Sequence, residues 1–458
     1  MSPYEHAFYP IRLYRVLFMA NIILKPKPDA AQCLDMMKQD AAFEVSCDAD
    51  AEDTAVRCAG AVSSGRAACR VSKLYLAGKC INNCSYCGCR CSREDEDFSP
   101  RTDSASGIKP HMKSYLLSPR ELAELAVAEA ASCGRGVFLS SAIDGSANET
   151  QERLAEAARI MRQELYYDGY LHCKVMPGAD PELIERTGRY SSRLSVNIEV
   201  ASSSGYALIA RDKSREKILR PMGIISQKIE CARYERRAFA TSETTQLMAG
   251  AIGEDDRTIL TLADALYKKY KLRRVYYTAY SYRHEAAGYE NLSLRQTPYW
   301  RMSRLYQADR LISQYGFTPD DITPDREGET NLFEDIDPKA AWALRHLDMF
   351  PVEVNRADFE TLIRVPGIGI TYARRIMEAR RYAPVTHELM KRLHISMKRC
   401  IWLITCNGVY HGGGALDSET LRGNLTSNVS PAAEGGVISS SLADKRRVEQ
   451  LPLPDIII

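Results

Sequence analysis

Residues 79–89 read KCINNCSYCGC, and the cysteines in this stretch decide the fold that we predict for the chain. Cys80, Cys84 and Cys87 stand as Cys-x3-Cys-x2-Cys, and the aromatic Tyr86 comes directly before the last thiol. A structural zinc site normally has four protein ligands, and a self-contained iron–sulfur cluster normally has four thiolates. Three closely spaced cysteines therefore indicate a metal centre with one open coordination position, which is where chemistry takes place.

The spacing and its aromatic residue resemble those of radical S-adenosylmethionine enzymes. The resemblance implies a [4Fe–4S] cluster on Cys80, Cys84 and Cys87, with Tyr86 beside the cofactor and a fourth iron free to bind S-adenosylmethionine. In such enzymes an electron enters the sulfonium, and the C–S bond breaks to give methionine and a 5′-deoxyadenosyl radical. The cofactor carries the difficult step, and the protein positions the reactants.

A zinc knot is the alternative for these cysteines, and it would need a fourth ligand such as Cys89, Cys91 or Cys69. The strand-like VSKLYLAG before the triplet, and the barrel-like motifs after it, favour the cluster. The 14 cysteines are scattered over 458 residues, which favours reduced thiols and a cytoplasmic location.

The composition is that of an ordinary globular protein, with 45% hydrophobic and 26% charged residues. A chain of this length can bury one large core and a smaller one. The net charge of +2 does not indicate a polyanionic partner for the whole chain, so charge has to be considered by segment. The apolar start is interrupted by Arg12 and Arg15 and is too short to span a membrane, so we expect no membrane partner.

From residue 71 onward, short apolar runs alternate with helical periodicity, which is typical of βα units and a parallel sheet. We predict an α/β fold, a partial (β/α)6 TIM-like barrel of the radical S-adenosylmethionine type over residues 35–335, with ligands at the carboxyl ends of the strands. The expected strands are residues 73–77, 136–143, 170–176, 193–200, 244–249 and 274–280.

Three segments are expected to lie outside regular structure. Residues 1–34 form an N-terminal extension, and residues 88–116 are a charged stretch without periodicity that we expect to be a mobile loop beside the cluster. Residues 412–458 lack the apolar density to fold alone, so we expect a disordered tail.

Polar residues at the strand ends are candidates for binding the cofactor. Ser140 and Ser141 follow the second strand, where the superfamily often has a Gly-Gly-Glu-like segment that receives the methionyl amino group. Ser195, Asn197 and Glu199 share one face of the fourth strand, because strand side chains alternate with a period of two. Ribose hydroxyls and methionyl groups would satisfy such polar groups; a solvent-exposed face is the alternative.

Gly250 and Glu254 follow the fifth strand and resemble the superfamily's glycine motif near adenine. Arg211, Lys213 and Arg215 are interpreted as a solvated helix cap, with binding of a substrate phosphate as the alternative. The stretch PYWRMSRLYQADRLISQYGF interleaves aromatic residues with arginines, which would suit either stacked bases or a helix with one buried face.

Residues 352–381 form the second strong motif, in which a glycine-rich turn joins two helical patterns. The motif resembles the helix-hairpin-helix of DNA-binding proteins, where backbone N–H groups at a helix N-terminus bind a phosphate oxygen. A protein-interaction or packing element is the alternative. The candidate DNA-binding residues are Pro366, Gly367, Ile368, Gly369, Thr371, Arg374 and Arg375.

The charge of this segment agrees with phosphate binding. From Pro351 to His411, ten Lys and Arg residues stand against five Asp and Glu residues, a net charge of +5 in a chain whose total is +2. A second, degenerate hairpin is expected around residues 394–397. We therefore predict a small all-α helix-hairpin-helix domain over residues 336–411.

The triplet together with SVNIE, TTQLMAGA and RVPGIGITYARRI resembles a bacterial family described as radical S-adenosylmethionine proteins of DNA modification or repair, over residues 35–411. The resemblance implies an enzyme that repairs or modifies DNA held at its phosphate backbone and takes electrons from a donor such as flavodoxin or ferredoxin. Two alternatives stay open: an RNA-modifying enzyme of the same type, and a non-catalytic nucleic-acid-binding protein with a structural metal.

Overall fold

The computed structural model describes residues 71–87, 89–90, 115–133, 136–280, 297–324, 330–395, 397–413 and 417–427. The expected extension at residues 1–34 lies outside these ranges, as does most of the expected loop at residues 88–116. Within the described ranges, no helix is both long enough and apolar enough to cross a membrane.

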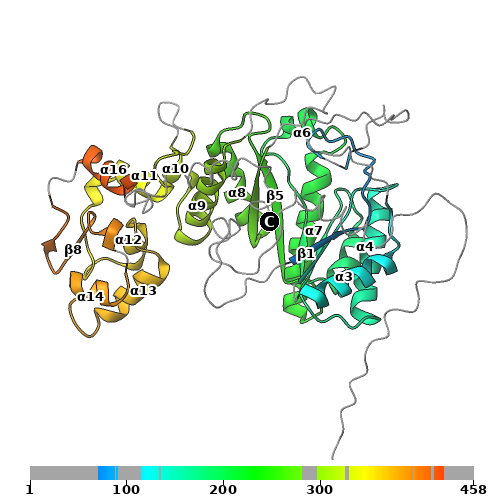
Figure 1. Cartoon of the computed structure of the whole chain (residues 1–458), viewed down its shortest axis with the longest axis horizontal. Helices are drawn as coiled ribbons and strands as arrows, with labels where there is room; N and C mark the ends of the chain where they lie inside the picture. The colour runs from blue at the N-terminus through cyan, green and yellow to red at the C-terminus, as the bar shows by residue number, and fades with distance from the viewer. Residues whose placement is uncertain are drawn as a thin grey trace, which may run out of the picture.

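The larger part of the molecule is built on a parallel sheet of six strands that follow one another in chain order. Each strand pairs in parallel with the next, which confirms the predicted α/β class and the six-strand half-barrel. Figure 1 shows this open sheet with helices packed along it. The strands are β1 (Val71–Tyr75), β2 (Gly136–Ser140), β3 (Leu171–Lys174), β4 (Arg193–Ser195), β5 (Ser242–Ala249) and β6 (Arg274–Ala279).

The helices between the strands cover one face of the sheet, and the strand side chains directed at them are apolar. Leu74, Leu139, Leu194 and Leu247 each have 0% of their surface exposed. Several of these helices begin at a side chain that caps a backbone N–H; Ser214, for example, accepts from the backbone N–H of Lys217. The helices are α3 (Pro119–Cys133), α4 (Ala147–Gln163), α5 (Pro181–Tyr190), α6 (Ser203–Ile209), α7 (Arg215–Glu235) and α8 (Asp256–Tyr270).

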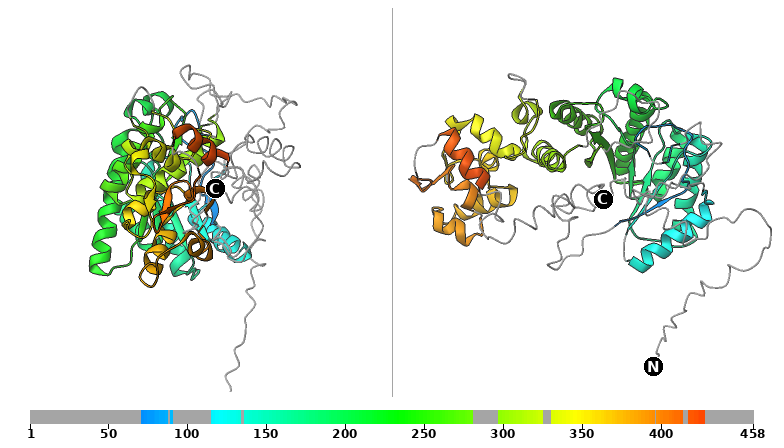
Figure 2. Two further views of the ribbon diagram at one scale, coloured as in Figure 1. Left: turned by 90° about the vertical axis from the view of Figure 1, so that its left-hand side faces the viewer. Right: turned by 45° about the horizontal axis from the view of Figure 1, so that its top comes forward.

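The C-terminal elements from α9 onward form a smaller part, as Figure 2 shows. They are α9 (Tyr299–Tyr315), α10 (Pro319–Ile322), α11 (Pro338–Arg345), η2 (Leu347–Met349), β7 (Val352–Glu353), α12 (Phe359–Arg364), α13 (Ile370–Ala379), α14 (His387–Arg392), α15 (Met397–Cys400), β8 (Ile404–Cys406), β9 (Val409–Tyr410) and α16 (Ser418–Ser427).

This smaller part is not all-α, so that prediction is wrong. A sheet of three strands in the order β7-β8-β9 joins its two ends, with β7 parallel to β8 and β8 antiparallel to β9. Val352 and Ile404 are register partners and are buried. Strands of two or three residues are too short to show an alternating pattern, and only the tertiary pairing reveals them.

The expected disordered tail is also wrong at residues 418–427, which form α16. Leu421 and Leu425 stand one helical turn apart and are buried, at 3% and 0% exposed, and α16 packs on α11. Arg422 also pairs with Asp335, 2.8 Å between Nη2 and Oδ2. The segment is therefore held by two buried leucines together with this ion pair.

Helix α9 contains the aromatic and arginine residues that could have served as a base-stacking surface. Tyr306 is buried, and its hydroxyl donates to the carbonyl of Tyr277, 3.0 Å away. Arg304 donates to the carbonyls of Phe333 and Glu334. These side chains therefore belong to the packing between the sheet and the smaller part.

Candidate functional site

The three cysteines of the triplet lie in the loop after β1, at the carboxyl ends of the strands. The loop is fixed from both sides, because the N–H of Ile81 donates to Ile143 after β2 and the N–H of Ser85 donates to Ile209 in α6, each at 2.9 Å. Cys80, Cys84 and Cys87 are all free thiols. Each interacts electrostatically with the other two, so the structure brings the predicted ligands together.

Backbone N–H groups point at two of the sulfur atoms. Cys80 Sγ lies 3.4 Å from the N of Asn82 and 3.4 Å from the N of Ile143, and Cys87 Sγ lies 3.4 Å from the N of Cys89. Such donors stabilise negative charge on sulfur and tune metal-bound thiolates. These N–H groups lower the pKa values of Cys80 and Cys87 and so oppose the effect of burial on the two thiols.

The three thiols differ in acidity. A hydrogen bond from Cys89 lowers the pKa of Cys87 to about 6, against the effect of its burial. Burial raises the pKa of Cys84 to about 12 and also raises the pKa of Cys80. A bound cation would reverse the effect of burial, because a coordinating thiol is deprotonated.

Within the described ranges, no group of three or more His, Cys, Asp or Glu side chains is arranged to hold one metal ion. Of the candidate fourth ligands for zinc, Cys89 lies in the loop, and Cys91 and Cys69 lie outside the described residues.

An ion pair joins the cysteine loop to the end of the fourth strand. Lys213 Nζ lies 2.8 Å from Glu199 Oε1 and 3.2 Å from the hydroxyl of Tyr86. The side chains of Lys213 and Glu199 are only 13% and 8% exposed. The interpretation of Lys213 as a solvated cap is therefore wrong, although Arg211 and Arg215 are exposed as expected. The position of Lys213, after the fourth predicted strand, was the signal in the sequence that could have identified this lysine as a site residue.

The surroundings of Lys213 favour its charged form. Burial disfavours the ammonium form of Lys213, but Glu199 and Tyr86 together hold its pKa well above the usual value. Glu199 itself has a positive φ of 64°, a conformation that costs about 1–3 kcal/mol for a residue with a side chain. Hydrogen bonds of its backbone to Gln246 and Met248 hold it there. Such strain at a strand end is typical of a functional site.

The predicted serines take up different positions. Ser140 is the last residue of β2 and is buried beside the cysteine loop, while the hydroxyl of Ser141 donates to the carbonyl of Ala142. Ser195 Oγ lies 2.8 Å from His172 Nε2 inside the half-barrel, deeper than Glu199. Asn197 is half-buried between those two levels. The strand β4 ends at Ser195, so the prediction that Ser195, Asn197 and Glu199 share one face of this strand is wrong: Asn197 and Glu199 follow the strand, and Glu199 has a positive φ.

Gly250 and Glu254 shape their own loop. Gly250 has a φ of 87°, and its N–H donates to Glu254 Oε1 at 2.6 Å; the N–H of Ile252 donates to the other carboxylate oxygen. A Cβ at Gly250 would lie 2.0 Å from Thr297 Oγ1, so only glycine fits there. The carboxylate of Glu254 is thus used to hold the loop, and a cofactor would meet the backbone.

The glycine-rich turn joins α12 to α13 in the manner predicted. Gly367 has a φ of 91°, and a Cβ there would lie 3.0 Å from both Arg399 Cβ and the N of Cys400. Ile368 is fully buried, and its carbonyl accepts a hydrogen bond of 2.6 Å from Lys339 Nζ. Gly369 caps α13. Pro366 is buried at the same turn, so the backbone conformation is fixed from several sides.

Thr371, Arg374 and Arg375 lie on the exposed side of α13. Arg375 donates to the carbonyl of Leu393, 3.1 Å away, at the turn between α14 and α15. Those two short helices take the place of the expected second hairpin, and His394 between them has a φ of 57°. The two turns are therefore neighbours, with cationic side chains at their surface.

The fold is similar to that of solved structures, among them a radical S-adenosylmethionine enzyme structure. The crystal structure of SuiB from Streptococcus suis bound to S-adenosylmethionine matches with 11% sequence identity and a TM-score of 0.36, over 54% of this chain and 48% of SuiB. The matched region thus spans about half the length of SuiB. No protein-family model and no curated protein matches the sequence.

Proposed function

We propose that this protein is a radical S-adenosylmethionine enzyme that repairs or modifies DNA. The observation that carries the proposal is the gathering of Cys80, Cys84 and Cys87 at the carboxyl ends of a parallel six-strand half-barrel, with backbone N–H groups donating to the sulfur atoms of Cys80 and Cys87. In this class of fold, reactive groups come from the carboxyl ends of the strands.

A [4Fe–4S] cluster with bound S-adenosylmethionine would supply one-electron chemistry and a 5′-deoxyadenosyl radical at this place. The three thiolates would hold it, and the N–H groups of Asn82, Ile143 and Cys89 would stabilise the charge on two of them, Cys80 and Cys87. The loop holds these donors in place through its contacts with β2 and α6.

Lys213 and Glu199 would position the cofactor rather than react. Their ion pair brings one cation and one anion to the edge of the cysteine loop, with the hydroxyl of Tyr86 3.2 Å from the ammonium. Amino and carboxylate groups on a ligand would find matching charges there. Burial strengthens such interactions because little water competes for the charged groups.

The hairpin would hold the nucleic acid. The first N–H groups of α13 have no partner within the helix, which makes them suitable donors to a phosphate oxygen. Arg374 and Arg375 are exposed on the same helix and add positive charge. Contacts of this kind position a duplex without reading its sequence. A target base inside a duplex would have to be flipped out before reaction.

The test is anaerobic reconstitution of the full-length protein with iron and sulfide, followed by measurement of 5′-deoxyadenosine after addition of S-adenosylmethionine and dithionite. We expect the wild-type protein to form 5′-deoxyadenosine. We expect the rate of its formation to fall at least a hundredfold in Cys80→Ala, Cys84→Ala and Cys87→Ala. Cys231→Ala is the matched control, because Cys231 is a half-buried free thiol on α7, away from the loop. No reductant-dependent product from the wild-type protein would overturn the proposal.

The same preparations separate the alternatives. About one zinc and no iron after anaerobic purification would support a non-catalytic nucleic-acid-binding protein, and Cys89→Ala would then lose metal if Cys89 were the fourth ligand. For the cluster, we expect Cys89→Ala to retain iron, because the backbone N–H of residue 89 remains. Much tighter binding of structured RNA than of duplex DNA in salt titrations would favour an RNA-modifying enzyme.

A further inference from the structure

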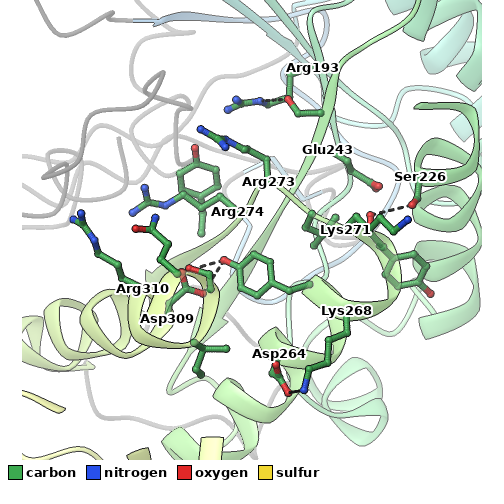
Figure 3. Close-up of a pocket in the computed structure, with 18 of the residues that line it drawn as sticks. Arg193, Ser226, Glu243, Asp264, Lys268, Lys271, Arg273, Arg274, Asp309 and Arg310 are labelled. Carbon is green, nitrogen blue, oxygen red and sulfur yellow. Dashed lines mark hydrogen bonds and ion pairs between the residues drawn. The ribbon is translucent and has the colours of Figure 1, made fainter. Parts of the chain in front are cut away.

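A second polar cavity lies at the opposite end of the strands from the cysteine loop. It has a volume of about 970 Å³ and is lined by the amino-terminal residues of β4, β5 and β6 together with α7, α8 and α9. Figure 3 shows Arg193, Glu243 and Arg274 around it. Arg193 begins β4, whereas the cysteine loop lies at the carboxyl ends of the strands, so the cavity and the candidate cluster site lie at opposite ends of the sheet.

The lining of the cavity is cationic. Seven of its side chains are Arg or Lys and four are Asp or Glu, which gives a net charge of +3. Two of the acids are paired with lysines of the same lining: Glu230 with Lys271, and Asp264 with Lys268 at 2.7 Å. The positive excess is therefore carried by arginines, whose planar guanidinium groups match phosphate oxygens.

Arg274 is held at the floor of the cavity by two aromatic rings. Its guanidinium carbon lies 5.6 Å from the ring centre of Tyr276 and 5.4 Å from that of Tyr306. Stacking of this kind fixes the plane of the guanidinium and leaves its edge available for hydrogen bonds. Arg310, on α9, lines the same cavity and is drawn on the same side in Figure 3.

Glu243 is the unusual member of the lining. Its residue surface is 1% exposed, and neither carboxyl oxygen has a hydrogen-bond partner within the described part of the chain. Burial raises the pKa of this carboxyl well above the usual value and so favours its protonated form. Asp309, which lines the same cavity, by contrast accepts hydrogen bonds from the hydroxyls of Tyr267 and Tyr277. A buried polar group without a hydrogen-bond partner destabilises the folded state.

We propose that this cavity binds a nucleotide, with its phosphate against the arginines and a hydrogen-bonding group of its base reaching Glu243. A protonated carboxyl offers both a donor and an acceptor, as the edge of a base does. The volume lies at the upper end of the usual range for small-molecule pockets, about 300–1,000 Å³. The site is independent of the proposed radical chemistry, because binding needs neither the cluster nor a reductant.

The first experiment is calorimetric titration of the anaerobically purified full-length protein with deoxyadenosine 5′-monophosphate at low ionic strength. We expect saturable binding, at least tenfold weaker binding of deoxyadenosine, and at least tenfold weaker nucleotide binding by Arg274→Gln. Arg220→Gln is the matched control, because Arg220 is exposed on α7 but does not line the cavity. Absence of nucleotide binding by the wild-type protein, or an equal loss of nucleotide affinity in Arg274→Gln and Arg220→Gln, would overturn the proposal.

A second variant separates ligand binding from a purely structural role. Glu243→Leu removes the buried carboxyl, so we expect a melting temperature equal to or higher than that of the wild-type protein, together with at least tenfold weaker nucleotide binding. Unchanged nucleotide affinity in this variant would contradict the role of Glu243 and overturn the proposed nucleotide site.

The nucleotide could be free or part of a single strand. A 5′-phosphorylated DNA decamer distinguishes the two when titrated into an Arg374→Gln/Arg375→Gln background, which weakens binding at the hairpin. Tighter binding of the decamer than of the mononucleotide, lost on Arg274→Gln, would identify a strand. The reverse order of affinities would identify a free nucleotide.

Discussion

At the scale of single residues, Lys213 is the side chain that most clearly unites the candidate site. It stands 127 residues from Tyr86 in sequence, yet its ammonium lies 3.2 Å from that hydroxyl and 2.8 Å from Glu199. These contacts connect the cysteine loop, the segment after β4 and the segment before α7. Its removal should therefore affect more than a local contact.

We expect Lys213→Met to lower the free energy of unfolding by about 3–5 kcal/mol, because the variant leaves the buried Glu199 carboxylate without its cation. The measurement is guanidinium unfolding under anaerobic conditions. Lys268→Met is the control: its partner is Asp264, and the lysine side chain is 71% exposed, so a change below about 1 kcal/mol is expected.

Partial recovery of stability in the double variant Lys213→Met/Glu199→Gln would show that the cost arises from the unpaired charge. Equal losses of unfolding free energy in Lys213→Met and Lys268→Met would show that the buried ion pair stabilises the protein no more than the exposed one.

At the scale of elements, the turn between α12 and α13 depends on one glycine. Gly367→Ala would place a methyl group 3.0 Å from Arg399 Cβ and the N of Cys400, at a φ of 91°. We expect a loss of about 1–3 kcal/mol in the free energy of unfolding and weaker binding of duplex DNA, because the N-terminus of α13 must shift. Chemical denaturation and fluorescence anisotropy measure the two effects.

Gly423→Ala is the matched control for that substitution. Gly423 lies in α16 with no atom within 4 Å of an added Cβ. Alanine in a helix is favoured over glycine by about 1 kcal/mol, so this variant should be as stable as the wild-type protein or more stable. DNA affinity that is unchanged in Gly367→Ala would argue against the hairpin as the binding element.

At the scale of the whole molecule, charge is divided unevenly. The segment from Pro351 to His411 has a net charge of +5, whereas the complete chain has +2, so the rest of the chain is net negative. Long-range attraction of a polyanion should therefore be directed to the hairpin part.

We expect the affinity for duplex DNA to fall steeply with salt, and we expect Arg374→Gln and Arg375→Gln each to reduce the slope of log K against log salt by about 1. Each guanidinium is exposed on α13, where it would neutralise one phosphate. Arg220→Gln, on the barrel, should leave the slope unchanged. Identical slopes in all three variants would show that DNA does not contact α13.

Much of this architecture was readable from the chain. The six strands of the half-barrel all lie where the alternation of apolar runs predicted them, with ends that differ by a few residues. Helices α12 and α13 flank the glycine-rich turn as expected. These features are local, because a strand or helix is specified by the spacing of apolar residues within one short window.

The features that the sequence did not predict have a common cause, which is that they depend on long-range contacts. The strands β7, β8 and β9 have two or three residues each, and α16 depends on packing against α11. The buried position of Lys213 likewise depends on where a distant loop passes. None of these can be specified within one window of sequence.

The sequence by itself therefore determined the order of the strands, the cysteine triplet and the glycine turn, since backbone sterics and side-chain periodicity act over a few residues. The tertiary structure alone decided that Lys213 joins Tyr86 and Glu199, and that Arg274 and the unpartnered Glu243 share a cavity at the far end of the sheet. The pairing of parallel strands brings together loop ends that are far apart in the chain, and long-range contacts of that kind are set by the packing of the whole sheet.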